Sequence, residues 1–402
     1  MKNEPKIYHI LFFGFISDHQ HLLEVFSSEE NPQVSAIKFQ QAIIEAISKN
    51  GAAVRILSTL PISSFPRNRT LLVRSRDFSL GEANGRLMGF INLPVVNLFS
   101  RLISSFGSGR RELRTQPKVD AILVYALHTP YVLAAVILKY MFGVKLGVLI
   151  PDLPLNMNGR NEFGIKALAK RLDNWILRNL SRHIDVSFPI TKYIAEDWLP
   201  EGIKFEVIEG IANSNVSPRI KTREENRRKK ILYAGTFSHL SSFVRMFSER
   251  PEIPADLVFV GGGPDRAQIE MAAQVDSRIS VKPFLHGREY AEEVANADFL
   301  LNARDPNWRG SRYSFPSKLF EYMSLEVPIL STRMAGIPDE YFRCFFCIHD
   351  NDPEKFAVSL LEALNASDAE LASRIAVGRK IVTKHKSPEA VGATLLYALR
   401  ET

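Results

Sequence analysis

The segment 313–341, YSFPSKLFEYMSLEVPILSTRMAGIPDEY, contains the residues whose types and spacing most favour ligand binding. Ser317 can cap the start of a helix, and Lys318 falls in the first turn of that helix. A cation there opposes the helix dipole, but a phosphate bound by the free amides and the ammonium group would resolve the conflict. Glu321 follows one turn later on the Lys318 side, where its carboxylate can accept the two hydroxyl groups of a ribose. A surface ion pair between Lys318 and Glu321 is the alternative.

The run VGGGP, at 260–264, is a second candidate for contact with a phosphate. Gly262 and its neighbours let the backbone approach a ligand, and the helix that follows presents unpaired N–H groups. The order differs from G-x-G-x-x-G, so a plain tight turn is the alternative interpretation.

Alternating strands and helices must position these motifs. In the first half of the chain, short apolar runs alternate with segments of helical spacing. The apolar region 119–150 contains charged residues and is interrupted at Gly143, so we interpret it as strand, helix and strand rather than as a membrane span. The short N-terminal apolar stretch lacks a cleavage site, and we expect no signal peptide. We expect strands at 7–13, 54–57, 119–125, 144–150, 186–189 and 205–208, and helices at 34–49, 130–142 and 165–180.

A charged run at 220–230, without apolar periodicity, predicts a linker before the second half. Strands that alternate with helices predict parallel βαβ units, and 402 residues are enough for two such domains. The sequence therefore predicts two doubly wound α/β domains that bind ligands at the carboxyl ends of their strands. In the second domain we expect strands at 231–235, 257–263, 279–284, 299–303, 328–332 and 344–348, and helices at 290–296, 317–325 and 353–364.

Composition excludes several classes of protein. Hydrophobic residues make up 46% and charged residues 24%, which are globular values and rule out a disordered or fibrous chain. The net charge of +7 favours phosphorylated ligands or anionic lipid, but it is too diffuse for a nucleic-acid binder.

The two cysteines, Cys344 and Cys347, cannot staple a secreted protein of this size, so we expect a cytoplasmic location. Their C-F-F-C spacing leaves a redox pair or half a zinc site as an alternative to a buried strand. We favour the strand, because positions i and i+3 of a strand point to opposite faces.

FPSKLFEYMSLEVPIL, followed by a glycine-bearing loop, resembles the nucleotide-sugar site of the family 4 retaining glycosyltransferases of the GT-B fold. The likeness is greatest to the bacterial subgroup that builds capsular, exopolysaccharide and O-antigen chains. It extends to ILYAGTF, VFVGGGP and ANADFLLNARD, and more loosely to 30–61 and 120–154. The resemblance implies two Rossmann-like domains that face each other across a cleft. These are an acceptor-binding domain over 1–212, onto which a helix at 386–402 can pack back, and a donor-binding domain over 213–385.

The resemblance further implies transfer of a sugar from a UDP- or GDP-sugar with retention at the anomeric carbon, without a metal or another cofactor. Carried over by position, Glu321 holds the ribose, and the backbone amides of Ser317, Lys318 and Leu319 meet the donor phosphates. Phe284 and Leu285 match the segment that cups the base. The other donor-side candidates are Gly235, Thr236, Gly262, Arg304, Arg312 and Tyr313.

On the donor side, two features depart from the family pattern. Tyr313 stands where the first glutamate of the E-x7-E motif is expected, so the usual contact with the donor sugar must be made differently. The Arg and Lys that usually follow the first donor-domain strand are absent from 235–239. The residues that can supply this charge are Lys318, Arg304, Arg309 and Arg312.

A third departure concerns the catalytic loop. The family's usual histidine aligns with Pro151, which leaves Asp152 beside it as a catalytic candidate, and His128 ends the preceding strand. Lys318, at the donor phosphates, is the third. A structural role remains an alternative for His128, as does a turn-capping role for Asp152.

On the acceptor side, Gly14 ends the first strand, while Asn31 and Ser35 lie at the start of a helix, so we expect all three at the ligand-binding edge. The segment 86–114 combines an apolar stretch with several arginines. It is interpreted as a basic element that lies on a membrane surface and presents a lipid-linked acceptor, or as a core helix with a solvated end, which is slightly favoured. These arginines are Arg101, Arg110, Arg111 and Arg114.

These inferences converge on a retaining hexosyltransferase of bacterial surface polysaccharide synthesis, cytoplasmic or peripheral on the inner face of the membrane. Its expected acceptor is a saccharide or an undecaprenyl-type lipid-linked saccharide, and no nucleic-acid partner is expected. Two alternative functions remain open. They are a nucleotide-sugar epimerase or hydrolase of the same fold, and a non-catalytic sugar-nucleotide-binding subunit.

Overall fold

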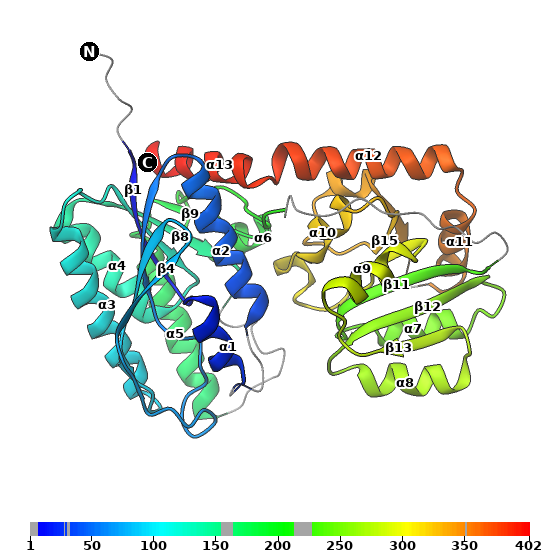
Figure 1. Ribbon diagram of the computed structural model, residues 1–402, viewed down its shortest axis with the longest axis horizontal. Coiled ribbons are helices and arrows are strands. Elements are labelled where there is room, and N and C mark those ends of the chain that lie inside the picture. The colour runs from blue at the N-terminus through cyan, green and yellow to red at the C-terminus, as the bar shows by residue number, and fades with distance from the viewer. Residues whose placement is uncertain (1–6, 28, 30–32, 154–163, 213–226, 350–351) are drawn as a thin grey trace, which may run out of the picture. The chain divides into compact units, whose positions relative to one another are not determined.

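The computed structural model describes the chain except for residues 1–6, 28, 30–32, 154–163, 213–226 and 350–351. It divides into two compact units (Figure 1). Unit 1 comprises Met1–Ile211 and Pro388–Thr402, and unit 2 comprises Ala212–Ser387. The sequence placed the two divisions at 212/213 and 385/386, and the structure has them at 211/212 and 387/388.

The described part of unit 1 contains an eight-stranded sheet with the order β10-β9-β8-β7-β1-β2-β5-β4. All neighbouring strands are parallel except β4 and β5. The central strands are apolar on both faces because helices cover both sides of the sheet. The strands are β1 (His9–Gly14), β2 (Ala53–Ser58), β4 (Arg76–Leu80), β5 (Ala83–Leu87), β7 (Ala121–Tyr125), β8 (Lys145–Ile150), β9 (Val186–Pro189) and β10 (Lys204–Phe205).

Helices cover the two faces of this sheet (Figure 1). On one face, α2 and the C-terminal α13 pack together, and a Cβ at Gly392 of α13 would lie 2.1 Å from the Ala46 carbonyl of α2. On the other face, α3 packs closely on α4, where Gly109 meets Leu138. The helices of unit 1 are α1 (His19–Ser27), α2 (Val34–Lys49), α3 (Val96–Arg114), α4 (Thr129–Phe142), α5 (Ile165–Ser181), α6 (Lys192–Trp198) and α13 (Pro388–Arg400).

Unit 2 contains a parallel six-stranded sheet with the order β13-β12-β11-β14-β15-β16 among its described residues. Apolar side chains of α7, α8 and α11 pack on one face of the sheet, and those of α9, α10 and α12 pack on the other. The strands are β11 (Lys229–Thr236), β12 (Ala255–Gly262), β13 (Ile279–Lys282), β14 (Phe299–Asn302), β15 (Ile329–Thr332) and β16 (Phe345–Ile348). The helices are α7 (Ser241–Ser248), α8 (Arg266–Val275), α9 (Gly287–Ala295), α10 (Lys318–Ser324), α11 (Pro353–Leu364) and α12 (Asp368–His385), with 3-10 turns η1 (Ser311–Tyr313) and η2 (Asp339–Arg343).

Both sheets reverse their strand order at one internal point. In unit 1 this switch point lies between β1 and β7, and in unit 2 it lies between β11 and β14. Ligands of open α/β sheets bind beside the carboxyl ends of the strands at such points. The loops after these four strands therefore carry the candidate sites, and the predicted doubly wound α/β fold is confirmed for both units.

Several sequence predictions need correction in detail. The strand expected at 205–208 is only Lys204–Phe205, and the linker expected at 220–230 runs into β11, which begins at Lys229. Most of that linker, 213–226, lies outside the described residues. The antiparallel β4–β5 pair and the small sheet of β3 (Leu72–Val73) with β6 (Phe90–Ile91) were not predicted.

The cysteines and the helices bear on two further expectations. Cys344 is buried just before β16 and Cys347 lies within that strand; both are free thiols. Burial raises the pKa of the Cys344 thiol to about 12, so this side chain stays protonated. Among the described residues, the helices lack a stretch that is both long and apolar enough to cross a membrane.

Candidate functional site

Beside the switch point of unit 2, glycine backbone forms the carboxyl ends of β11 and β12. Gly235 and Gly261 are partners in the β11–β12 ladder, and a Cβ at Gly261 would lie 2.0 Å from the Gly235 carbonyl oxygen. The φ angle of Gly261 is +141°, which side chains rarely adopt. A Cβ at Gly263 would lie 2.6 Å from the Phe237 carbonyl oxygen. Gly261 and Gly263 are therefore required by the close packing of β11 on β12 and of the loops that follow these strands. Thr236 is exposed at the end of β11.

Cations and aromatic rings surround this open edge. Arg304, after β14, lies against the hydroxyl of Tyr233, whose pKa is raised chiefly by burial and lowered in part by Arg304. The Arg304 backbone exchanges two hydrogen bonds with the Thr332 hydroxyl, at 3.1 and 2.7 Å, which ties this loop to the end of β15. His239, with a positive φ of 61°, stacks on Trp308 at 4.6 Å. Neither ring of this stack was predicted from the sequence as a site residue.

Lys318 and Glu321 meet a third residue that the sequence analysis missed. The Tyr290 hydroxyl donates to Glu321 Oε1 at 2.7 Å and accepts from Lys318 Nζ at 3.1 Å. Lys318 Nζ also lies 3.3 Å from Glu321 Oε2, so the ion pair that the sequence left as an alternative is present. Burial raises the pKa of Tyr290, with smaller contributions from Tyr322 and Glu321, which keeps its hydroxyl a donor.

The start of α10 differs in part from the prediction. Ser317 has helical backbone angles and its hydroxyl does not cap the helix. The Leu319 amide donates to the Pro316 carbonyl at 2.9 Å, so it is already engaged. The amides of Ser317 and Lys318 donate to no group in the described part of the chain. These two amides, rather than three, are open to a ligand.

Four further donor-side candidates lie around this edge. Phe284 is 57% exposed after β13, and a Cβ at Gly262 would lie 3.3 Å from its ring, so the ring stands over that glycine. Leu285 is half-buried against the core beside it. Arg312 lies over the ring of Tyr313 at 5.5 Å, on η1. The fold thus brings Phe284 to Gly262, while Tyr313 lies on a separate turn before α10.

The switch point of unit 1 is filled by side chains. The Gly14 carbonyl accepts from the hydroxyls of Ser58 and Tyr131, at 3.0 and 2.9 Å, and a Cβ at Gly14 would lie 2.6 Å from Gln40 Oε1. Thr59 Oγ1 lies 2.7 Å from the Tyr131 hydroxyl. Gly14 is buried, and its carbonyl is engaged within the fold.

His128 and Arg101 pack against Phe15 at the same point. The His128 ring lies edge-on to Phe15 at 5.0 Å and to Tyr131 at 4.7 Å, and its Nδ1 is buried without a hydrogen-bond partner among the described residues. Burial, and then the charge of Arg101, lower the pKa of His128 to about 3, so the ring is neutral at pH 7.

Arg101, which the sequence placed with Arg110, Arg111 and Arg114 in one basic segment, is a buried cation. The side chain is 8% exposed, Nη2 donates to the Leu60 carbonyl at 3.2 Å, and the guanidinium lies 4.1 Å from the Phe90 ring centroid. Within the described residues, no carboxylate forms an ion pair with it. Its charge therefore adds to the effect of burial in keeping the neighbouring imidazole deprotonated.

The remaining unit 1 candidates lie nearer the surface. Asp152 follows β8, and burial of its carboxyl raises the pKa to about 6 even though the residue keeps an exposed side. Ser35 is exposed in the first turn of α2. Asn31 lies outside the described residues. Asp152 is therefore the candidate whose proton equilibrium lies nearest neutral pH.

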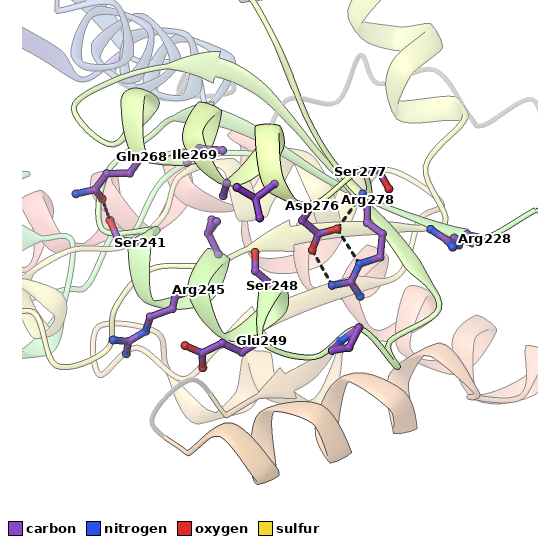
Figure 2. Close-up of a pocket in the computed structure, with 14 residues that line it drawn as sticks. Arg228, Ser241, Arg245, Ser248, Glu249, Gln268, Ile269, Asp276, Ser277 and Arg278 are labelled. Atoms are coloured by element: carbon purple, nitrogen blue, oxygen red, sulfur yellow. Dashed lines mark hydrogen bonds and ion pairs between the residues drawn. The ribbon is translucent and has the colours of Figure 1, made fainter.

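A pocket of about 680 Å³ lies elsewhere on unit 2, between α7 and α8 (Figure 2). Its wall includes Arg228 and Arg278, which precede β11 and β13, and the Asp276–Arg278 ion pair at 2.7 Å. These residues lie at the amino ends of the strands, opposite the edge where doubly wound sheets bind ligands. The candidate site therefore lies outside this pocket.

Two Rossmann-like domains with parallel sheets define the class of protein: the chain has the GT-B fold. Residues 228–366, within unit 2, match the family described as Glycosyl transferases group 1, which supports a glycosyltransferase. A comparison with curated protein sequences finds no match.

Solved structures match nearly the whole chain. The α,α-trehalose 6-phosphate synthase of Burkholderia multivorans is 12% identical, with a TM-score of 0.63 over 98% of this chain and 96% of that one. The lipopolysaccharide outer core galactosyltransferase WaaB is 12% identical, with a TM-score of 0.63 over 98% and 99%. Anabaena HepE in complex with UDP is 10% identical, with a TM-score of 0.59 over 98% and 100%. At these identities the likeness shows the fold alone.

Proposed function

We propose that the protein is a retaining hexosyltransferase that moves a sugar from a UDP- or GDP-sugar to a saccharide acceptor. The observation that carries the proposal is the Tyr290–Lys318–Glu321 group beside the open amides of Ser317 and Lys318, within the segment that matches the glycosyltransferase family. Neighbours in fold act as trehalose-phosphate synthases and as a galactosyltransferase, and one binds UDP, which supports this donor class.

On the donor side, Glu321 binds the ribose hydroxyls. Each of its oxygens takes one internal hydrogen bond or ion pair, and a carboxylate offers about four acceptor positions, so capacity remains for two hydroxyl groups. Lys318, with the amides of Ser317 and Lys318, neutralises the leaving diphosphate, so that transfer proceeds without a metal. Phe284 and Leu285 contact the base. Gly235, Thr236, Gly262, Arg304, Arg312 and Tyr313 complete the donor side.

On the acceptor side, Asp152 orients or deprotonates the acceptor hydroxyl, since a carboxyl with its pKa raised to about 6 is close to balance at neutral pH. His128 stays neutral and positions the groups packed on it. Asn31 and Ser35 belong to the acceptor side by position, whereas Gly14 supports it only through packing. The acceptor is a bacterial surface saccharide, free or linked to an undecaprenyl-type lipid, and the enzyme works at the cytoplasmic face of the membrane.

Glu321→Ala tests the assignment directly. We expect donor affinity, measured by calorimetry with UDP- and GDP-sugars, to fall about tenfold or more, because two charge-assisted hydrogen bonds are lost. Glu326→Ala is the matched control, since Glu326 follows α10 but pairs with Arg379 at 2.6 Å and faces solvent. Donor affinity that is unchanged in Glu321→Ala, with both variants folded, contradicts the proposal.

A further inference from the structure

Helix α3 in unit 1 turns an apolar side to solvent and a mostly polar side to the protein. Its buried side carries Arg101, Ser105 and Gly109 before Leu113, all four residues apart, so small and polar groups face the protein. Val96, Phe99 and Ile103, at positions i, i+3 and i+7, face solvent, and Phe99 and Ile103 are 62% and 71% exposed. An apolar stripe on the outer side of a helix is the reverse of what a water-facing helix requires.

The small β3–β6 sheet continues this apolar surface. Leu72 and Ile91 are directly paired across the two strands, so they share a face, and both are exposed while Val73 and Phe90 are buried. The Ile91 amide donates to Ser100 Oγ of α3 at 3.1 Å, which joins the sheet to the helix. We call the whole surface the apolar patch. Its members are Leu71, Leu72, Ile91, Leu93, Val95, Val96, Phe99 and Ile103.

The turn before α3 is strained and holds the Val95 side chain toward solvent. Val95 has φ 65° and ψ −49°, and the Val96 amide donates to the Pro94 carbonyl at 2.7 Å, which makes a γ-turn of the rare kind with positive φ. A β-branched residue in this region is a true outlier. Strain of this kind persists only where the surrounding structure holds it, and here Val95 is 65% exposed.

Arginines flank the patch. The segment 67–76, RNRTLLVRSR, surrounds Leu71 and Leu72 with four arginines and contains no acidic residue. All four are exposed, and Arg76 pairs with Asp18. An interface between two copies related by a twofold axis would bring these like charges together. A bilayer with anionic headgroups instead offers acyl chains to the apolar side chains and negative charge to the arginines.

We propose that the apolar patch docks unit 1 onto an anionic lipid surface. Phe99, Ile103 and Leu72 enter the boundary between headgroups and acyl chains, while Arg67, Arg69 and Arg74 contact the headgroups. This extends the peripheral membrane contact of the proposed function to a defined surface, in which Arg101 takes no part because it is buried. Docking needs no nucleotide sugar, so it stands or falls separately from the donor assignment.

The test is co-sedimentation of the full chain with vesicles of phosphatidylglycerol and phosphatidylcholine, and with phosphatidylcholine alone. Phe99→Glu with Ile103→Glu should lower partitioning about a hundredfold, since each large apolar side chain is worth more than about tenfold. Arg69→Gln with Arg74→Gln should lower it about fivefold per arginine on anionic vesicles only. Val275→Glu is the matched control, because Val275 is 90% exposed on α8 of unit 2, where it neighbours a single exposed large apolar side chain of the described residues, Met271, one turn earlier.

Two outcomes overturn the proposal. One is partitioning that is unchanged in the Phe99→Glu and Ile103→Glu variant, or equal on both kinds of vesicle. The other is a lipid-free dimer in light scattering that this variant dissociates, which assigns the patch to contact between copies. Each replaced side chain is exposed, so thermal melts should show all variants folded.

Discussion

The two switch points have the same strand topology, but different groups surround them. In unit 2, glycine backbone forms the adjoining ends of β11 and β12, Thr236 is exposed, and the cation Lys318 is part-exposed beside Glu321. In unit 1, the rings of Phe15, His128 and Tyr131 fill the equivalent place, and the nearby cation, Arg101, is buried.

Strand order therefore determines where a candidate site lies, whereas the volume of the side chains at that place determines its chemistry. An edge made of backbone can offer amides and cations to a phosphate-bearing ligand. An edge filled with rings excludes water, and there burial shifts proton equilibria, as it does for His128. This contrast favours ligand binding at unit 2 and positioning or proton chemistry at unit 1.

Gly261→Ala has the largest expected effect and tests whether the glycine edge of unit 2 is a packing requirement. A Cβ 2.0 Å from the Gly235 carbonyl, at a φ of +141°, forces the paired ends of β11 and β12 apart. We expect the free energy of unfolding of unit 2 to fall by about 3 kcal/mol or more in denaturant titration.

Gly107→Ala is its control, because Gly107 lies in α3 with no atom within 4 Å of an added Cβ. It should raise stability by about 0.5–1 kcal/mol. Equal effects of the two substitutions would show that the glycine edge of unit 2 is not a packing requirement.

His128→Gln tests whether burial shifts the proton equilibrium at the switch point of unit 1. The folded pKa of about 3 lies below the ordinary 6.5, so between these values the unfolded chain binds a proton that the folded chain does not. The wild type therefore loses stability as the pH falls below 6.5, by up to about 1.4 kcal/mol per pH unit from this group. The variant should be more stable relative to wild type at pH 5 than at pH 7, by about 2 kcal/mol.

Asp152→Asn is the control, because the stability difference between this variant and the wild type should change with pH in the opposite direction. The Asp152 carboxyl has its pKa raised from 3.8 to about 6, so its contribution is present at low pH and is lost as the pH rises through that range. Stability differences for His128→Gln that do not change with pH would contradict burial as the cause of its shift.

Val95→Gly has the smallest expected effect. Glycine adopts a φ of 65° without strain, so the free energy of unfolding should rise by about 1 kcal/mol in denaturant titration. Leu98→Gly, in the first turn of α3, should instead lower it by about 1 kcal/mol. A loss of stability in Val95→Gly would show that the turn is not strained.

The sequence predicted most parallel strands because strands buried on both faces are continuous apolar runs, as at 119–125 and 144–150. It did not predict the β4–β5 pair or the β3–β6 sheet, whose exposed, mixed faces carry no clear period. In the site, Lys318 and Glu321 were found because they share one helix. Tyr290, 28 positions from Lys318, could not be found because only folding brings it to them.

By itself, the sequence determined the two doubly wound domains and the segment of unit 2 that matches the glycosyltransferase family, since both rest on local periodicity and on a contiguous motif. Only the tertiary structure showed that Tyr290 contacts Lys318 and Glu321 and that Arg101 is buried. It alone showed that α3 turns its apolar side to solvent. Burial and partnership depend on residues distant in the chain, and no local pattern records them.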